Sequence, residues 1–328
     1  MRNGRMTQRG AILLAGALGA VILILLFPLW RTMAWSSPVE EPKTASDSGT
    51  AVTGVVSSGA AISGGAISGG AVSGDGTEWI QPEGMTLESR IQAPSGYERT
   101  EAEENSLAVF LRTYPVRKNG AKVKQFNGQP TGNQDDHVAI FKLPLERVNL
   151  QQATSSIQRV IAEYLWKQEK YNQISFQFGN GFKADYIRWR EGYRISNTAS
   201  GTVWVEQGTY DESYENFQKY LQAVFLKTSG ATMEKESEKT TLSKLKAGDV
   251  FVKSGTGGHA VMVVDVCENA EGKKAFLLAQ GGTPAQQFHV IKNPAHDNDP
   301  WYYEEEIKYP LETPGYKFPK GSLRSLSY

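Results

Sequence analysis

Three apolar runs decide the fold of this chain: Gly248-Asp249-Val250-Phe251, then Gly257-Gly258-His259-Ala260-Val261-Met262-Val263-Val264-Asp265, then Phe276-Leu277-Leu278-Ala279-Gln280. Glycine punctuates them, which predicts neighbouring β-strands at 249–253, 259–266 and 274–280. A fourth run at 288–292 follows within the last eighty residues. The C-terminal part is therefore expected to be a meander-like antiparallel sheet.

The second and third runs are expected to form a hairpin through residues 267–273. A pairing centre between Asn269 and Ala270 would place His259 directly opposite Gln280, on the same face of the sheet. A side-chain amide at that position can hydrogen-bond to an imidazole and orient it. The alternative interpretation is that His259 is a polar residue that opens a strand after a glycine turn.

Helical patterns precede this sheet. Thr100 and Glu103 have the spacing of a capping box and predict a helix through about Arg112. Asn149 is a plausible N-cap for a longer helix, and Ser213 for a third. Both longer helices carry an apolar stripe, which predicts core packing. The apolar residues are Leu150, Ala153, Ile157, Val160, Ile161, Tyr164 and Leu165, then Tyr214, Phe217, Tyr220, Leu221, Val224 and Phe225.

Together these patterns predict one α+β domain over 79–328, with helices packed on an antiparallel sheet. Further strands are expected at 137–143, 174–178 and 202–206. The prolines at 310, 314 and 319 predict that residues 309–319 wrap the surface as extended chain.

The N-terminal region has a different composition. Residues 11–30 carry no charge and are long enough to cross a bilayer as a helix. Arg2, Arg5 and Arg9 precede them, so the positive-inside rule predicts a cytoplasmic tail at 1–10 and an external C-terminal domain. This predicts a single-pass protein of the cell membrane. The alternative is a cleaved signal peptide, but Trp30-Arg31 does not resemble a cleavage site.

Residues 31–78 are predicted to be a flexible linker. They are rich in Gly, Ser and Ala and contain the repeat Ala61-Ile62-Ser63-Gly64-Gly65, Ala66-Ile67-Ser68-Gly69-Gly70. Such a composition buries too little surface to offset the entropy of ordering. A short self-associating solenoid is the alternative.

Charge and cysteine content exclude several classes of function. Thirty-five basic residues balance thirty-five acidic ones, and no basic cluster suited to a phosphate backbone occurs, so nucleic acid is not an expected partner. The single Cys267 excludes an internal disulfide and any multi-cysteine metal site. No cofactor is expected.

The order of motifs carries a resemblance. A long helix, a Gly-Asp strand, a Gly-His strand and a strand ending in Gln280 are similar to the papain-like NlpC-type cell-wall peptidases and the cysteine, histidine-dependent amidases. Over 79–328 the chain also resembles an uncharacterised bacterial family of membrane-anchored proteins, carried as a domain of unknown function. The segments that carry this second resemblance are Leu150-Gln151-Gln152, Ala162-Glu163-Tyr164-Leu165, Gly248-Asp249-Val250-Phe251, Gly258-His259-Ala260-Val261, Leu278-Ala279-Gln280 and Pro284-Ala285-Gln286.

The peptidase resemblance implies a papain-like domain with a cysteine nucleophile at the N-terminus of the long helix. In this chain that position is Ala153, and a methyl group cannot attack an amide. On this scaffold His259 and Gln280 are the expected catalytic pair, with Gln152 in the binding cleft. His289, in a strand between Phe288 and Val290, is also assigned to the cleft. We therefore expect the cleft to bind a peptide or cell-wall fragment without turnover.

Two alternatives remain open at this stage. In one, the protein is an amide hydrolase in which His259 activates a water or the hydroxyl of Thr154, Ser155 or Ser156. In the other, it is a non-catalytic structural or interaction module. Cys267 cannot replace the missing nucleophile, because eight residues of extended strand separate it from His259 by about 26 Å.

Other polar and aromatic residues receive structural interpretations. His137 begins a strand and is expected at the surface or at an edge. His296, Asp297 and Asp299 share one loop without a recognised ligand spacing, so a loop is favoured over a metal site. Aromatic residues that could form a platform for sugars are more often core. These are Trp189, Trp204, Trp301, Tyr302 and Tyr303.

Overall fold

The computed structural model describes residues 79–327. The predicted cytoplasmic tail (1–10), membrane helix (11–30) and linker (31–78) all lie outside the described residues. Within the described range, no helix combines the length and apolar character needed to cross a membrane.

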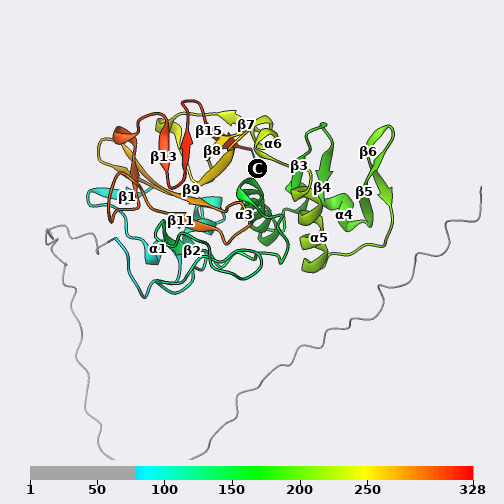
Figure 1. The fold of residues 1–328 in the computed structure, drawn as a ribbon, viewed down its shortest axis with the longest axis horizontal. Helices are drawn as coiled ribbons and strands as arrows, with labels where there is room; N and C mark the ends of the chain where they lie inside the picture. Colours follow the sequence, from blue (N-terminus) through cyan, green and yellow to red (C-terminus); the bar gives the residue numbers. More distant parts are fainter. Residues whose placement is uncertain (1–78, 328) are drawn as a thin grey trace, which may run out of the picture. The chain divides into compact units, whose positions relative to one another are not determined.

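An antiparallel nine-stranded sheet organises the domain, with helices packed against it (Figure 1). This confirms the predicted α+β class. The path along the sheet is β2-β11-β10-β9-β8-β15-β7, while β1 pairs with β9 and β12 with β10. The strands are β1 (Tyr97–Arg99), β2 (His137–Ile140), β7 (Ser237–Lys239), β8 (Val250–Lys253), β9 (His259–Asn269), β10 (Lys274–Gln280), β11 (His289–Ile291), β12 (Tyr302–Tyr303) and β15 (Leu323–Leu326).

Three two-stranded ribbons, six α-helices and three short 3-10 helices complete the described elements; the 3-10 helices are Tyr171–Gln173, Leu242–Lys244 and Glu304–Glu306. The ribbons are β3 (Ser175–Gln177) with β4 (Lys183–Asp185), β5 (Tyr193–Thr198) with β6 (Gly201–Glu206), and β13 (Leu311–Thr313) with β14 (Tyr316–Phe318). The α-helices are α1 (Leu87–Arg90), α2 (Leu107–Thr113), α3 (Ala153–Lys167), α4 (Tyr186–Arg190), α5 (Tyr214–Phe225) and α6 (Gly230–Lys235).

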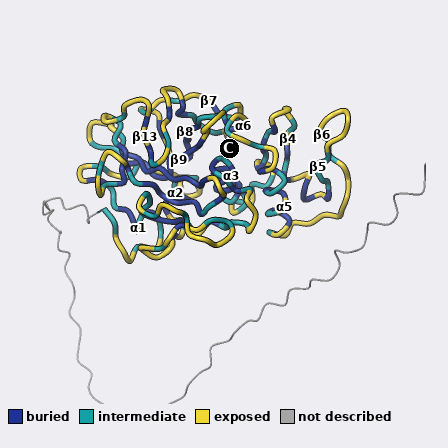
Figure 2. The backbone as a smooth tube through the Cα atoms, in the orientation of Figure 1, coloured by how far each residue is buried: buried dark blue, intermediate teal, exposed yellow. Residues whose placement is uncertain are grey.

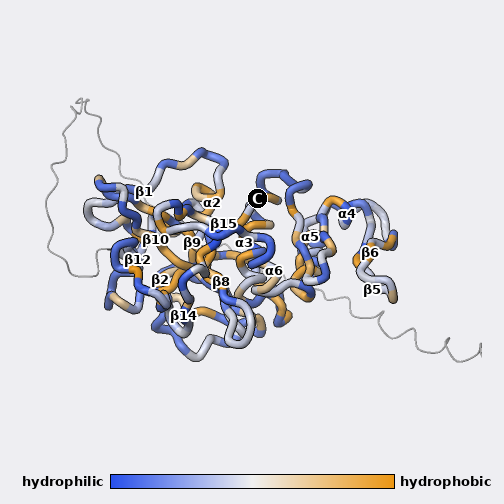
Figure 3. The backbone as a smooth tube through the Cα atoms, turned by 90° about the horizontal axis from the view of Figure 1, so that it is seen from above, coloured by the Kyte–Doolittle hydropathy of each residue, from blue (hydrophilic) through white to orange (hydrophobic). Residues whose placement is uncertain are grey.

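Strand β9 is buried on both faces. Ala260, Met262 and Val264 belong to the larger core cluster, which includes the apolar side of α3. Val261 and Val263 belong to a smaller cluster on the opposite face. Figure 2 shows this central region in dark blue, and Figure 3 shows apolar colouring along β8 and β9. Burial on both faces explains why the run reads as continuously apolar instead of alternating.

The β9–β10 hairpin has a different register from the predicted one. Ala275 pairs with Cys267, and after a bulge Ala279 pairs with Met262. The turn is centred on Glu271 instead of between Asn269 and Ala270, and the Asn269 side chain accepts hydrogen bonds from the backbone N–H groups of Glu271 and Lys273. Continued by one residue, this register places Gln280 opposite Val261, so His259 is its diagonal neighbour and the predicted direct pairing is wrong.

The helix starts are partly as predicted. Ser213 caps α5 by accepting from the N–H of Asn216. The predicted caps at Thr100 and Asn149 are wrong, because α2 begins after Ser106 and α3 after Gln152. Thr100 instead continues the edge contact of β1, since its N–H donates to the carbonyl of Val266.

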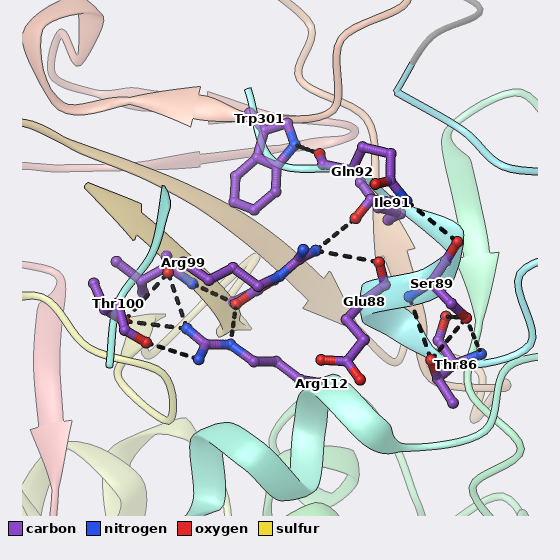
Figure 4. Close-up of polar contacts among 11 residues, drawn as sticks. Thr86, Glu88, Ser89, Ile91, Gln92, Arg99, Thr100, Arg112 and Trp301 are labelled. Atoms are coloured by element: carbon purple, nitrogen blue, oxygen red, sulfur yellow. Dashed lines mark hydrogen bonds and ion pairs between the residues drawn. The ribbon is translucent and has the colours of Figure 1, made fainter. Parts of the chain in front are cut away.

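A buried ionic cluster joins β1, α2 and β9 (Figure 4). The carboxylate of Asp265 is fully buried and accepts from Nε of Arg99 and Nε of Arg112, each at 2.7 Å. The other guanidinium nitrogens of the same two arginines donate to backbone carbonyls. Arg99 donates to Ile91, and Arg112 donates to Thr100. Every charge in the cluster is thus matched by close polar partners, as a buried ion pair requires.

The C-terminal region differs from the expected extended chain. Residues 311–318 form the β13–β14 hairpin, and Phe318 is fully buried in the smaller core cluster. Beyond it, β15 pairs with both β8 and β7 in the main sheet. Pro310 and Pro319 flank this hairpin, and Pro314 lies in its turn, where no strand hydrogen bond is required of them.

Candidate functional site

His259 begins β9, directly after a tight turn closed by a hydrogen bond from the N–H of Gly258 to the carbonyl of Gly255. A Cβ atom on Gly258 would lie 2.7 Å from the carbonyl oxygen of Lys253, so the turn requires glycine there. The turn brings His259 to the cross-strand position beside Lys253. The Gly-Gly-His sequence therefore sets where the imidazole lies.

The imidazole of His259 is held by Gln280. Its Nε2 lies 2.7 Å from Oε1 of the amide, at the end of β10. An amide oxygen only accepts, so Nε2 carries the ring proton and Nδ1 has a free lone pair. Among residues 79–327, Nδ1 has no hydrogen-bond partner, and it is not among the buried unpaired atoms, so it retains contact with solvent.

Tyr316 covers the ring of His259. The two rings stack with centroids 3.5 Å apart and planes 4° from parallel, and only 3 % of His259 is exposed. Burial lowers the pKa of His259 to about 4, although the hydrogen bond that Nε2 donates to Gln280 acts in the opposite direction. The imidazole is therefore neutral near pH 7 and can accept a proton or a hydrogen bond through Nδ1.

One cavity of about 410 Å³ connects His259 to the start of α3. Ala153, the first residue of the helix, lines it together with Gln152, Thr154 and Ser155. The first-turn N–H groups of a helix lack partners within the helix and carry partial positive charge. The chain thus places a neutral imidazole and a helix N-terminus around one space, with the methyl group of Ala153 between the polar residues of that turn.

The end of β10 is pressed closely onto α3. A Cβ atom on Gly281 would lie 2.1 Å from Oγ of Ser156. Gln152 adds a polar link, because its Oε1 accepts from Oγ1 of Thr283 at 3.3 Å and its Nε2 contacts Oδ1 of Asn149 at 3.2 Å. These contacts fix Gln280 relative to the helix start, and the Gly281-Gly282 pair is the sequence signal for them.

His289 lies one strand further from the cavity. It is the cross-strand partner of Gln280 in β11, and its Nδ1 lies 2.8 Å from the carbonyl oxygen of Gln287. Burial lowers its pKa to about 4. His289 does not line the 410 Å³ cavity, so its contact with the candidate site is through Gln280.

The possible nucleophiles separate into two groups. Thr154 and Ser155 line the cavity, whereas Ser156 is fully buried and donates to the carbonyl of Gln151. Cys267 is fully buried on β9 opposite Ala275, and burial raises its pKa to about 12. No thiol reaches the cavity from residues 79–327.

Two residues of this region were missed by the sequence patterns. Tyr316 was placed in extended surface chain, and Lys253 appeared only as the last residue of a strand. Lys253 lines the cavity beside His259. Its cross-strand position follows from the Gly255 to Gly258 turn, which is the one sequence signal that indicates it.

The other candidates have structural roles. His137 lies on β2 at one end of the sheet path, as expected of an edge residue. His296 contacts Glu306, and Asp299 accepts from the N–H of Trp301 and the hydroxyl of Tyr303. In the part of the chain that the structure describes, no group of three His, Cys, Asp or Glu side chains is placed to hold a metal ion.

The aromatic residues considered as a sugar platform pack in the interior. Trp301 and Tyr302 are at most 1 % exposed, and Trp189 is 7 % exposed. Trp204 and Tyr303 are partly buried against the larger core cluster. The core interpretation is therefore confirmed.

Comparison with known proteins identifies a family but no named relative. A family model described as a domain of unknown function matches residues 87–325. A search of curated proteins and a search of solved structures each found no match. Because the family model covers well over half of the chain, this protein belongs to the family called domain of unknown function 4846.

Proposed function

We propose that this domain is a peptide-binding cleft on a papain-like scaffold that has lost its nucleophile. The observation that carries the proposal is that His259 and Ala153 line the same cavity. The side-chain amide of Gln280 orients the imidazole, which is the arrangement that activates a nucleophile in acyl-transfer enzymes. The nucleophile position itself carries only a methyl group.

The missing nucleophile favours binding over turnover. An acyl-enzyme needs a thiol or hydroxyl within hydrogen-bond reach of the base. Ala153 offers neither, while the cavity keeps polar groups that can hydrogen-bond to an amide backbone. These are the first turn of α3, the hydroxyls of Thr154 and Ser155, and Nδ1 of His259. A peptide or a peptide-bearing cell-wall fragment is therefore the proposed ligand.

The same proposal includes a location. Residues 11–30 are uncharged and are preceded by three arginines, which supports a single membrane span with the C-terminal domain outside the cell. The Gly-rich segment that follows supports a flexible tether. A domain held in this way would meet ligands at the outer face of the membrane.

Restoring the nucleophile tests the proposal. In the full-length protein, Ala153→Cys should create a thiol whose pKa lies at least about one unit below the usual 8.5, because Nδ1 of His259 can take up the thiol proton and the resulting imidazolium and the helix N-terminus stabilise the thiolate. The readout is the pH dependence of alkylation by iodoacetamide. The native Cys267 gives little background, since it is fully buried and its pKa is raised to about 12.

Thr154→Cys is the matched control, because it lies one residue further along the same helix turn and lines the same cavity. Adding His259→Ala to Ala153→Cys should return the thiol pKa toward its ordinary value. An Ala153→Cys thiol no more acidic than the Thr154→Cys thiol would refute the papain-like assignment. Hydrolysis of muropeptides by Ala153→Cys alone would support it further.

A second candidate function is an active amide hydrolase. The observation that favours it is that Thr154 and Ser155, which both carry hydroxyls, line the same cavity as His259. Muropeptide hydrolysis by the wild-type protein, lost in His259→Ala with the fold retained, would establish this reaction. Retained hydrolysis in His259→Ala would exclude it, and a protein that neither binds nor hydrolyses would be a structural module.

A further inference from the structure

Lys253 lies where two cavities meet. It lines the 410 Å³ cavity with His259 and Ala153, and it also lines a second cavity of about 520 Å³ with Tyr316 and the β13–β14 turn. Its strand, β8, is adjacent to β9, and Lys253 is the cross-strand partner of His259. A ligand that occupied both cavities would have to pass the side chain of Lys253.

The 410 Å³ cavity has a one-sided charge. Lys253 is the only Lys, Arg, Asp or Glu among the residues that line it. The nearby carboxylate of Glu234 accepts from the N–H and the hydroxyl of Ser254 and does not line the cavity. No carboxylate thus balances the ammonium group there.

The second cavity does not supply a partner either. Glu312 lines it, but this carboxylate forms an ion pair with Lys317. Within residues 79–327, Lys253 makes no salt bridge, whereas Lys274 and Lys219 each pair with a glutamate. Lys253 is thus a cation without a counter-charge on a cavity wall, and the N-terminus of α3, which also favours anions, lines the same cavity.

We propose that Lys253 binds a carboxylate of the ligand, so that the cleft is specific for anionic peptides. This inference rests on the proposed function, because it assigns the ligand class of the same cleft. An ammonium group acts as a point charge and accepts either source of carboxylate, the C-terminus of a peptide or an acidic side chain. Uncharged peptides have no carboxylate to pair with the ammonium group of Lys253.

Charge-matched alkylation tests this without a known ligand. In full-length Ala153→Cys, the rate of alkylation by iodoacetate is divided by the rate with iodoacetamide, and the ratio is normalised to that of free cysteine. We expect Lys253→Met to lower this ratio about tenfold and added salt to lower it in the parent variant, since screening weakens attraction between charges. Lys317→Met is the control, because Lys317 lines only the second cavity and is already paired with Glu312.

Protection of the introduced cysteine from alkylation distinguishes the two sources of carboxylate, a peptide C-terminus and an acidic side chain. Acetyl-Ala-Ala-Ala with a free C-terminus and acetyl-Ala-Glu-Ala amide compete for the cavity against their uncharged counterparts, the acetyl-Ala-Ala-Ala amide and acetyl-Ala-Gln-Ala amide. Slower alkylation with one charged peptide and not with its counterpart identifies the source, and this protection should vanish in Lys253→Met.

Failure of this inference can be separated from failure of the proposed function. An unchanged iodoacetate to iodoacetamide ratio in Lys253→Met overturns the carboxylate site, whatever the acidity of the thiol. If the Ala153→Cys thiol has ordinary acidity, the papain-like assignment fails, and the same ratio measured on Thr154→Cys still reports on Lys253. Equal protection by charged and uncharged peptides also overturns the inference.

Discussion

Two polar groups on one strand, β9, have opposite surroundings. Asp265 is fully buried and receives two guanidinium groups and a backbone N–H. His259 is almost as buried, at 3 % exposure, yet only its Nε2 is bonded, to Gln280. The first group has all its hydrogen bonds inside the protein, whereas the second keeps Nδ1 without a hydrogen-bond partner among residues 79–327, in a side chain that lines a cavity.

The difference separates a structural polar group from one that is available for binding. A buried charge is tolerated only where close partners replace water, and the Asp265 cluster meets that condition. His259 is instead left with an unused acceptor beside the first turn of α3. Burial alone does not distinguish the two residues, because both lie in the interior. They are distinguished by Nδ1 of His259, which has an unused hydrogen-bond acceptor.

The comparison is tested most severely by Asp265→Asn. This change leaves two guanidinium groups without their carboxylate, and we expect it to lower the free energy of unfolding by about 3 to 5 kcal/mol. Chemical denaturation followed by tryptophan fluorescence measures the loss. His259→Gln should cost only about 1 kcal/mol, the size of one hydrogen bond. Equal losses in the two variants would remove the distinction.

Gly281→Ala tests whether the candidate site depends on close contact between β10 and α3. The added methyl group would meet Oγ of Ser156 at 2.1 Å, so we expect a loss of about 1 to 3 kcal/mol in the free energy of unfolding. Gly132→Ala is the control, because nothing lies within 4 Å of that position. The double variant Gly281→Ala, Ser156→Ala should recover part of the loss.

The pH dependence of stability sharpens the comparison further. The pKa of His259 is about 4 in the folded protein and near 6.5 when unfolded, so the unfolded state binds a proton first as the pH falls. Stability is therefore lost below pH 6.5, by about 2 kcal/mol between pH 7 and 5 for this residue. His289 adds a similar loss. Denaturation at both pH values should show a smaller difference in His259→Gln; an unchanged difference would contradict the assigned burial effect.

Gln280→Leu should have the smallest effect on stability. It removes the acceptor for Nε2 of His259 but keeps an apolar side chain of similar size in place, so we expect a loss of about 1 kcal/mol, the size of one hydrogen bond. The larger consequence is expected in the Ala153→Cys background, where the introduced thiol should lose acidity because the imidazole is no longer oriented. Alkylation rates across pH measure this, and no change would show that Gln280 does not position the ring.

The strands and the longer helices could be predicted because their apolar patterns are long. The run from Ala260 to Val264 is buried on both faces, and α5 begins at the cap predicted for it. Short strands have too few residues to show a recognisable apolar pattern. The strands β7 and β15 each have three or four residues, and their place in the sheet depends on pairing partners distant in the sequence.

The candidate site was predictable to the extent that residue chemistry and motif order specify it. The contact of His259 with Gln280 was anticipated, although through a register that is wrong by two residues or more, because the turn is centred on Glu271 and a bulge follows in the hairpin. Tyr316 and Lys253 were not anticipated. The position of Tyr316 follows from tertiary contacts of the C-terminal hairpin, which no local pattern reveals, whereas that of Lys253 follows from pairing across the Gly255 to Gly258 turn.

The insertion of β15 between β8 and β7 has a consequence for the kinetics of folding. Strands β7 and β8 are close in the sequence, yet they are joined only through β15, about seventy residues further along the chain. Closing so long a loop slows the formation of a sheet. The β7–β15 edge of the sheet should therefore be among the last parts to acquire native protection from hydrogen exchange during refolding, after the β8–β9 and β9–β10 hairpins have formed.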